Sequence, residues 1–211
     1  MKILFVGAHH DDLEVSIGGS VRRWANDGHR IYSAILTDST WTAPDGTRHR
    51  DPSQVQHYAR NAAELLGYTQ IDLNFSSCFE LRYTDDKVTT LLGLIGDHSI
   101  DTLITISPND AHPDHRATSE IALNASRMVP RVLLCKVSWN SFPTTFQPRY
   151  FVDTSSMMET KSKALQCYED EYARTGPRWE RFIRSTGQLY GLEAGCEHAE
   201  GFEVLKYLYR S

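Results

Sequence analysis

The sequence predicts an α/β fold, a Rossmann-like three-layer sandwich around a mostly parallel central sheet. Two observations lead to this fold class. Compact apolar runs alternate along the chain with segments whose apolar residues recur at helical spacing, as strands and helices do in a parallel sheet covered by helices. In addition, two polar clusters each follow an apolar run and precede a helical segment, the place where open parallel sheets bind ligands.

The strands are predicted from short apolar runs. The first covers residues 2–8, where the apolar side chains continue without a break up to His9, as is typical of a buried strand. Four further strands are predicted at residues 30–37, 71–75, 101–106 and 131–137.

The helices are predicted from apolar spacing and from helix-start signals. The first, over residues 16–26, carries Ile17, Val21 and Trp24 at helical spacing, and Gly18-Gly19 would let it lie close to a sheet. Pro113 suits the first position of the helix that follows the fourth strand. The helices are expected at residues 16–26, 51–66, 85–98, 115–127 and 155–172, and loops that could cover a pocket at 38–52, 76–84, 139–149 and 174–178.

The two polar clusters are the most informative feature of the chain. They read His9-His10-Asp11-Asp12 and His112-Pro113-Asp114-His115, and each stands between a predicted strand and a helix. Because the carboxyl ends of parallel strands gather at one edge of a sheet, we expect the clusters to meet. His9, Asp12 and His115 would then supply two imidazoles and a carboxylate, a recurring ligand set of catalytic zinc.

The remaining cluster residues match what metal-assisted hydrolysis needs. Asp11 could accept a proton from water, and His112, held in one tautomer by Asp114, could stabilise an oxyanion or protonate a leaving amine. Each residue alone has a simpler structural interpretation, since Asp12 could be a helix N-cap and Pro113-Asp114 only a helix start. Coincidence at both clusters is improbable, and we therefore predict a metal site.

The clusters also carry a family resemblance. Residues 8–14 (AHHDDLE) resemble the Ala-His-Pro-Asp-Asp motif of the LmbE-like, or PIG-L-type, zinc-dependent N-deacetylases, and residues 112–117 (HPDHRA) resemble their second motif. The resemblance implies zinc bound by His9, Asp12 and His115. It also implies a general base, Asp11, with His112 as the polarising or proton-donating group and Asp114 orienting it.

The resemblance extends along most of the chain, with departures. Residues 151–153, 161–168 and 199–202 are similar to later parts of the family pattern. His10 stands where the family has proline; this extra imidazole near the metal could support the metal ligands or be merely a solvated side chain, and we favour the solvated side chain. Val55-Gln56-His57-Tyr58 replaces the family's Arg-x-x-Glu, and residues 37–41 replace its glycine-and-glutamate loop. These departures affect substrate contacts and leave the ligand and base positions unchanged.

Three residues are candidates for substrate binding. Trp41 and Trp139 fall in predicted loops, where an aromatic face could stack on a sugar ring. His198 is a candidate because it precedes the match at residues 199–202. Arginines in the loops are expected to be solvated unless the substrate carries phosphate; they are Arg48, Arg50 and Arg149.

Composition sets the remaining bounds. The 211 residues, 40% of them hydrophobic, are expected to form one domain over residues 1–211. A net charge of −5 without a Lys/Arg-rich run argues against a nucleic-acid partner. No segment predicts a membrane span or a secretory core, so we expect a cytoplasmic protein. Four cysteines without paired metal spacing are expected to be free thiols. The oligomeric state is open, with a homo-oligomer among the alternatives.

Three functions compete. The first, implied by the resemblance, is a zinc-dependent deacetylase that removes an acetyl group from an N-acetylated sugar of the N-acetylglucosamine type, free or in a glycoconjugate. The second is a metal-dependent amidase or esterase on a non-sugar substrate. The third is a non-catalytic carbohydrate- or nucleotide-binding protein, which leaves Asp11 and His112 unexplained. The same ligand set would accept Fe²⁺ or Co²⁺ in place of Zn²⁺. A dinucleotide site is disfavoured because the first loop lacks a glycine-rich turn.

Overall fold

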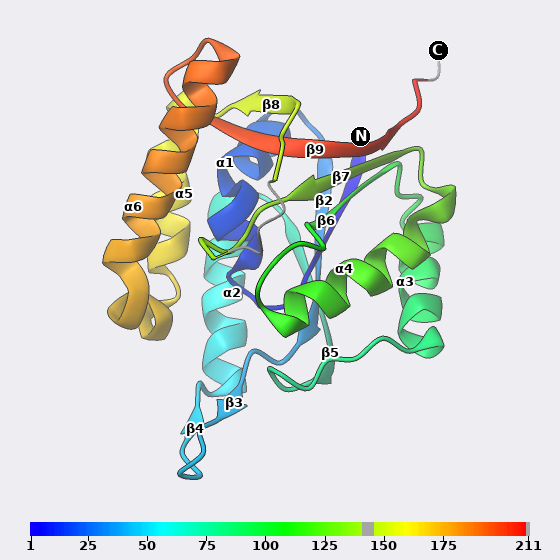
Figure 1. Cartoon of the computed structure of the whole chain (residues 1–211), viewed down its shortest axis with the longest axis vertical. Helices are drawn as coiled ribbons and strands as arrows, with labels where there is room; N and C mark the ends of the chain where they lie inside the picture. The colour runs from blue at the N-terminus through cyan, green and yellow to red at the C-terminus, as the bar shows by residue number, and fades with distance from the viewer. Residues whose placement is uncertain (141–145, 210–211) are drawn as a thin grey trace.

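Four strands with almost completely buried side chains form the middle of the structure, because their residues are apolar toward both faces. They are β1 (Lys2–Gly7), β2 (Arg30–Thr37), β6 (Thr102–Ile106) and β7 (Arg131–Cys135). The computed structural model describes residues 1–140 and 146–209 and arranges these strands in one central sheet (Figure 1). The predicted middle strands are thereby confirmed.

The sheet has seven strands in the order β5-β2-β1-β6-β7-β9-β8. Strand β5 (Thr69–Ser76) is the outermost of the five strands that run parallel. On the other side, β9 (Ala199–Tyr207) pairs antiparallel with both β7 and β8 (Tyr150–Asp153). In chain order, β2 and β5 lie on one side of β1, and β6 and β7 lie on the other. The order of the strands therefore reverses next to β1.

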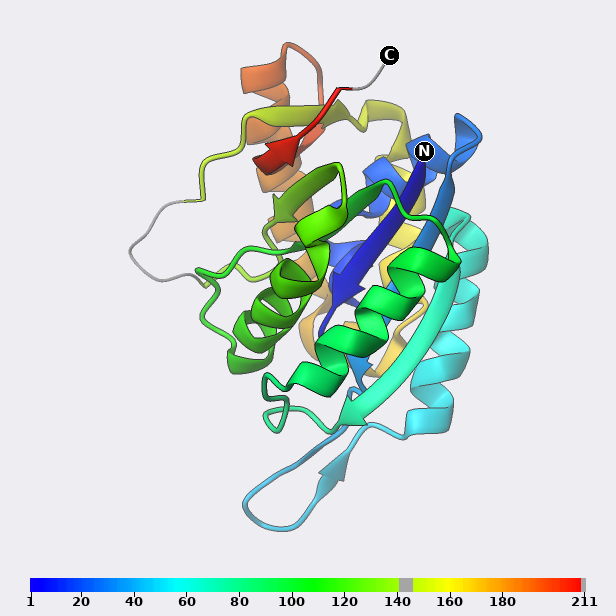
Figure 2. The same cartoon turned by 90° about the vertical axis from the view of Figure 1, so that its right-hand side faces the viewer.

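Helices cover both faces of the sheet, as Figures 1 and 2 show. One layer contains α1 (Asp12–Asn26), α2 (Pro52–Leu66), α5 (Met158–Gln166) and α6 (Glu169–Ala194). The other contains α3 (Asp85–Asp97) and α4 (Pro113–Ala125), which pack on a second apolar cluster. The predicted three-layer α/β fold is confirmed. Short 3-10 turns occur at Ser126–Met128 and Ser155–Met157, and β3 (Trp41–Thr42) pairs with β4 (Arg48–His49) in a projecting hairpin.

Two predicted features near the C-terminal helices are wrong. Residues 174–178 do not form a loop but lie inside α6, even though Pro177 lacks the N–H that a helix interior uses. Thr175 and Trp179 are buried on either side of that proline, so tertiary packing outweighs its cost. The predicted helix at 155–172 is also broken, because Tyr168 is non-helical and turns its hydroxyl inward to donate to the His10 carbonyl at 2.5 Å.

Helix α1 contains a kink that β9 stabilises. Ile17 has non-helical backbone angles, and the N–H groups of Gly19 and Ser20 donate to the Glu200 carboxylate at 3.0 and 2.6 Å. A Cβ on Gly19 would lie 2.9 Å from the side chain of Thr154, which agrees with the expectation that glycine permits close packing here. Lys161 completes the arrangement with an ion pair to Glu200 at 2.5 Å.

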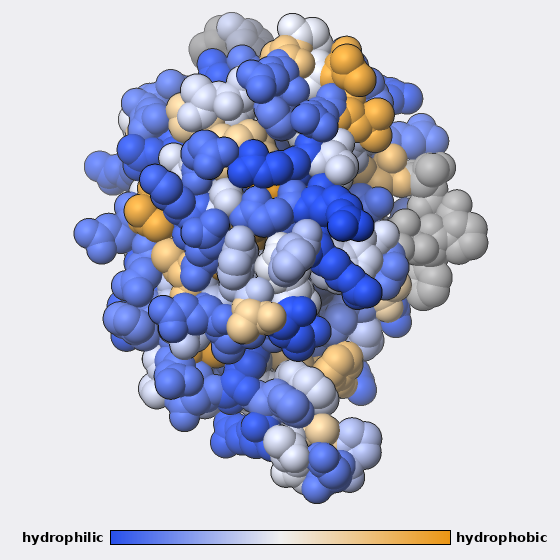
Figure 3. All heavy atoms as spheres, turned by 90° about the vertical axis from the view of Figure 1, so that its left-hand side faces the viewer, coloured by the Kyte–Doolittle hydropathy of each residue, from blue (hydrophilic) through white to orange (hydrophobic). Residues whose placement is uncertain are grey.

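The outer surface over α5 and α6 is mostly polar, with scattered apolar side chains (Figure 3). Within the described ranges, no helix combines the length and apolar character needed to cross a bilayer. The four cysteines, all within the described part, are free thiols as expected.

Candidate metal centre and active site

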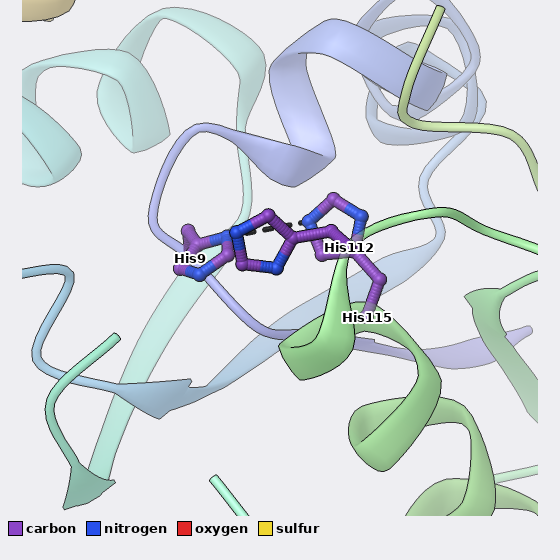
Figure 4. Close-up of side chains that lie close together, drawn as sticks. All are labelled: His9, His112 and His115. Carbon is purple, nitrogen blue, oxygen red and sulfur yellow. Dashed lines mark hydrogen bonds between the residues drawn. The ribbon is translucent and has the colours of Figure 1, made fainter. Parts of the chain in front are cut away.

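The two polar clusters meet where the strand order reverses. Strands β1 and β6 are parallel neighbours, while the helices that follow them lie on opposite faces of the sheet. Figure 4 shows His9 in the loop after β1 facing His112 and His115 at the start of α4. The three ring centroids lie 4.8 to 5.2 Å apart. The predicted meeting of the clusters therefore occurs, at the position where open α/β sheets bind ligands.

Three donor atoms form a triangle of the size that a metal ion requires. His115 Nε2 lies 3.2 Å from both His9 Nδ1 and Asp12 Oδ1, and the last two atoms are 3.6 Å apart. Ligand bonds of about 2.0–2.2 Å in a tetrahedron place neighbouring donors roughly 3.3–3.6 Å apart. The side chains of His9, Asp12 and His115 thus fit a four-coordinate ion with one position left open.

Among the described residues, two other sets of donor atoms also lie close together. The nitrogens of His9, His112 and His115 fall within 4.8 Å of one another, as do donor atoms of His9, Cys78 and Asp114. Both sets contain His9, so neither could bind a second ion while His9, Asp12 and His115 hold one. We favour the set with Asp12 because its separations of 3.2 to 3.6 Å match those of neighbouring donors around one ion.

Asp12 is fixed by its own loop. Its Oδ2 accepts the backbone N–H groups of Ala8 and His9, both at 2.9 Å, which leaves Oδ1 directed at the two histidines. The carboxylate therefore does not cap its helix, the simpler interpretation that the sequence allowed.

Each of the two histidines has a carboxylate on its far nitrogen. Asp114 Oδ2 lies 3.2 Å from His9 Nε2, and Asp110 Oδ1 lies 3.1 Å from His115 Nδ1. Such partners fix the imidazole tautomer that turns a lone pair toward the metal. Asp110, which is 4% exposed, was not among the predicted residues. Its only signal in the sequence is an acid in the loop before the second cluster.

His112 is oriented by backbone rather than by the Asp114 carboxylate. Its Nδ1 accepts the backbone N–H of Asp114 at 3.2 Å, whereas the nearest carboxylate oxygen is 3.9 Å away and already binds His9. Asp114 was expected to hold the His112 tautomer; it contacts His112 through its backbone N–H, because its carboxylate reaches back to His9 in the other loop. With Nδ1 accepting, the proton of neutral His112 lies on Nε2.

The electrostatics of the centre favour a cation between the donors. Burial by itself would lower the pKa of His115, but the carboxylates of Asp12 and Asp110 raise it to about 9. The pKa of His9 is likewise raised well above its ordinary value, against burial, by Asp12 and Asp114. The field that favours imidazolium there would favour a divalent ion. Burial and the neighbouring histidines lower the pKa of His112 to about 4.

Asp11 lies beside the donor set and contacts Arg50. Asp11 Oδ2 is 3.2 Å from Arg50 Nη1, and the side chain of Arg50 is only 7% exposed. The expectation that Arg50 is solvated is therefore wrong. The reason is that the chain after β4 turns inward, with Arg50 at a positive φ of 66°. Nothing in the residue spacing signals this contact.

A cavity of about 500 Å³ opens over the donor set. Trp41 and Trp139 both line it, together with Trp179 and Phe79. Phe79, whose ring centroid is 4.9 Å from that of His112 and which is half exposed, was missed by sequence reasoning. The predicted loops at 38–52 and 76–84 supply part of this wall, while residues 141–145 of the loop at 139–149 lie outside the described residues.

His198 does not line this cavity. Its backbone N–H donates to Ser155 Oγ and its carbonyl accepts the N–H of Thr154. His10 also differs from expectation, because it is 1% exposed rather than solvated. Its ring contacts Ser39 Oγ at 2.7 Å and Asp72 Oδ1 at 3.1 Å. It thereby joins the loop after β1 to the loop after β2 and to β5.

The fold and this donor set define an α/β protein with a site that could hold a metal ion beside a carboxylate and an imidazole. Comparison with known proteins gives the family. The family described as PIG-L, GlcNAc-PI de-N-acetylase, matches residues 4–126, more than half of the chain. The chain belongs to this family, as the resemblance of its two motifs implied.

Relatives and solved structures agree with that membership. Diacetylchitobiose deacetylase of Thermococcus kodakarensis is 25% identical over 97% of this chain and 83% of its own length. An Escherichia coli protein described as uncharacterized deacetylase YaiS is 31% identical over 69% of this chain and 80% of its own length. The structure of N,N'-diacetylchitobiose deacetylase from Pyrococcus horikoshii has a TM-score of 0.82 at 23% identity, covering 97% and 83% of the two chains.

The same fold also occurs in a protein described differently. GalB of Pseudomonas putida, 4-carboxy-2-hydroxymuconate hydratase, has a TM-score of 0.79 at 18% identity, covering 100% of this chain and 99% of its own. At such identity the likeness shows the fold alone.

Proposed function

We propose that this protein is a metal-dependent deacetylase that removes the acetyl group from an N-acetylated amino sugar. The observation that carries the proposal is the placement of Asp11 and His112 on one cavity, beside the donor triangle of His9, Asp12 and His115. Family membership and the deacetylase relatives support acetyl as the group that is removed. The diacetylchitobiose deacetylase relative supports a sugar of the N-acetylglucosamine type as the substrate.

Three side chains would hold the metal: His9, Asp12 and His115. Zinc suits two imidazoles and a carboxylate, and Fe²⁺ or Co²⁺ would suit them also. When bound, the ion supplies a Lewis acid that makes water more acidic and polarises the amide carbonyl. Asp114 and Asp110 keep the lone pairs of the two imidazoles directed at the ion.

The remaining residues divide the proton chemistry. Asp11 accepts a proton from water as the water oxygen bonds to the acetyl carbon. His112 donates a hydrogen bond from Nε2–H to the oxygen that becomes negative, since its Nδ1 is occupied by a backbone N–H. When the C–N bond breaks, the amine nitrogen takes the proton that Asp11 accepted. The products are acetate and the free amine.

A different amide or an ester is the alternative substrate. The same residues could hydrolyse either bond, and α2 carries Val55 to Tyr58 where the family has Arg-x-x-Glu. The likeness to GalB adds that this fold is not restricted to deacetylases.

Acetate release tests the proposal. Purified protein is incubated with N-acetylglucosamine, diacetylchitobiose and conjugated N-acetylglucosamine derivatives, beside its Asp11→Asn variant and a chelated sample with zinc added back. We expect acetate from at least one sugar, loss of that activity in the variant and the chelated sample, and recovery with zinc. Acetate release that persists in Asp11→Asn with full metal content would refute the role of the base. Release only from non-sugar amides or esters would favour the alternative.

A further inference from the structure

We propose that Arg50 is the positioning residue of the reaction: it holds the Asp11 carboxylate toward the cavity by tying it to the first turn of α6. The inference rests on the proposed function, because it assigns Arg50 to the base of that reaction. Arg50 is not part of the two polar clusters and lies between β4 and α2.

The contacts of Arg50 join two elements that are distant in sequence. Its Nη1 lies 3.2 Å from Asp11 Oδ2, and its Nε lies 2.9 Å from Asp170 Oδ2 in the first turn of α6. A guanidinium is planar, so two bonds from different nitrogens fix its orientation as well as its position. Arg50 therefore holds the Asp11 carboxylate in a fixed direction relative to α6.

The helix that Asp11 precedes does not hold this carboxylate. Asp11 is the N-cap residue of α1, but in the described structure its side chain accepts no capping hydrogen bond from the helix. Arg50 is the partner that the described contacts give it. Because the side chains of Asp11 and Arg50 are 13% and 7% exposed, water competes little for this contact.

The backbone of Arg50 is itself held in place. Its φ of 66° lies in the left-handed region, which is unusual for a residue other than glycine. Such a conformation persists where the surroundings enforce it. Here the next residue, Asp51, caps α2 by accepting the N–H groups of Ser53 and Gln54 at 2.8 and 3.2 Å. The side chain of Arg50 therefore extends from a backbone position that is itself fixed.

This arrangement argues against a role for Arg50 in binding a substrate anion. The guanidinium already faces two carboxylates, Asp11 and Asp170, so its charge is matched within the protein. Arg50 lines the cavity, and its Nη2 has no hydrogen-bond partner among the described residues. A substrate anion at that nitrogen would lie next to both carboxylates, which would repel it. The two carboxylate contacts therefore support the positioning role over anion binding.

Kinetics of a small set of variants tests the proposal, with whichever acylated substrate the wild-type protein hydrolyses. The set contains Arg50→Met, Arg50→Lys, Asp170→Asn and the double variant Arg50→Met/Asp170→Asn. Arg48→Met, an exposed arginine two residues away, is the matched control. We expect Arg50→Met to lower kcat about 10- to 100-fold, by analogy with the range found when the hydrogen-bond partner of a metal ligand is removed. KM and metal content stay within about twofold of wild type, Arg50→Lys recovers part of kcat, and Arg48→Met changes neither constant.

The double variant separates positioning from a general loss of structure. If Asp170 acts through Arg50, Asp170→Asn lowers kcat in the wild-type background and has no further effect in the Arg50→Met background. A kcat of Arg50→Met within threefold of wild type, a loss explained by lower metal content, or independent effects of Arg50→Met and Asp170→Asn would each overturn the proposal.

Inactivity of the wild-type protein would count against the proposed function and not against the contact. In that case, the contact is tested by the urea midpoints of unfolding of Arg50→Met, Asp11→Asn and their double variant. Removal of Arg50 leaves Asp11 buried without its partner, so Asp11→Asn should recover part of the midpoint lost in Arg50→Met. Additive midpoint shifts would overturn the inference.

Discussion

The carboxylate of Asp114 lies 3.2 Å from Nε2 of His9, although the two residues belong to different clusters. The acid of the second cluster thus orients a histidine of the first. Asp110 does the same for His115 from the loop before α4. Both imidazoles of the donor set are therefore fixed by acids that are not in the donor set, and each should contribute to metal affinity.

Replacing Asp114 by Asn should weaken zinc binding about 10- to 100-fold, since the carboxylate no longer fixes the His9 tautomer or raises its basicity. The measurement is competition with a chromophoric chelator. Asp110→Asn should have an effect of similar size through His115, because the geometry of the two contacts is alike. An affinity within threefold of wild type in both variants would show that the two acids do not support the donor set.

His112 should affect turnover and not metal binding. Loss of one hydrogen-bond donor to a developing oxyanion costs roughly 100- to 1,000-fold in kcat. We therefore expect His112→Ala to lose activity in this range while zinc affinity stays within threefold of wild type. A fall in affinity that parallels the fall in kcat would instead support the alternative donor set with three histidines.

Much of the fold and the centre of the site could be predicted from the sequence because the signals are local. The strand at β1 is a continuous apolar run, and the cluster that follows it can only lie at the carboxyl end of that strand. The order of the two clusters relative to their strands then brings His9 and His115 together. The resemblance to a family added roles for these residues.

The residues that escaped prediction are those whose partners are set by tertiary structure. Arg50 lies in a polar loop and resembles any solvated arginine until the hairpin after β2 turns it toward Asp11. His10 was expected in solvent, yet Ser39 in the loop after β2 and Asp72 in β5 contact its ring and bury it. A loop was predicted at residues 174–178, yet these residues lie inside α6 despite Pro177, because the helix is packed on both sides of that proline.

Glu14 should make the stability of the metal-free protein depend on pH. Burial raises the pKa of Glu14 to about 8, although the Tyr68 hydroxyl donates to the carboxyl at 2.6 Å. The folded protein therefore keeps a proton that the unfolded chain releases near the ordinary pKa of 4.5. The contribution of Glu14 is present in full below that pKa and is lost as the pH rises through about 8.

Urea unfolding of wild type and Glu14→Gln in chelator, from pH 5 to pH 8, measures this contribution. Glutamine resembles the protonated acid and does not titrate, so the variant should gain relative to wild type as the pH rises. The difference in unfolding free energy should change by at most about 1.4 kcal/mol per pH unit. A difference that is constant over this range would mean that Glu14 has the same pKa in the folded and unfolded states.

The ion pair of Lys161 and Glu200 should be important for stability because both side chains are buried, at 4% and 6% exposure. Glu200 also accepts two backbone N–H groups at the kink of α1, so it joins β9 to the helix that begins at the metal loop. Glu200→Gln would leave the Lys161 ammonium buried without its counter-charge. We expect this to lower the unfolding free energy by about 3–5 kcal/mol, measured by urea denaturation.

Lys161→Met/Glu200→Gln should be less destabilised than the sum of its single variants, because it leaves no unpaired charge. The exposed pair of Glu159 and Arg184 provides the control, since Glu159→Gln should cost less than about 1 kcal/mol. Equal effects of Glu200→Gln and Glu159→Gln would mean that the buried pair is not what holds β9 against α1.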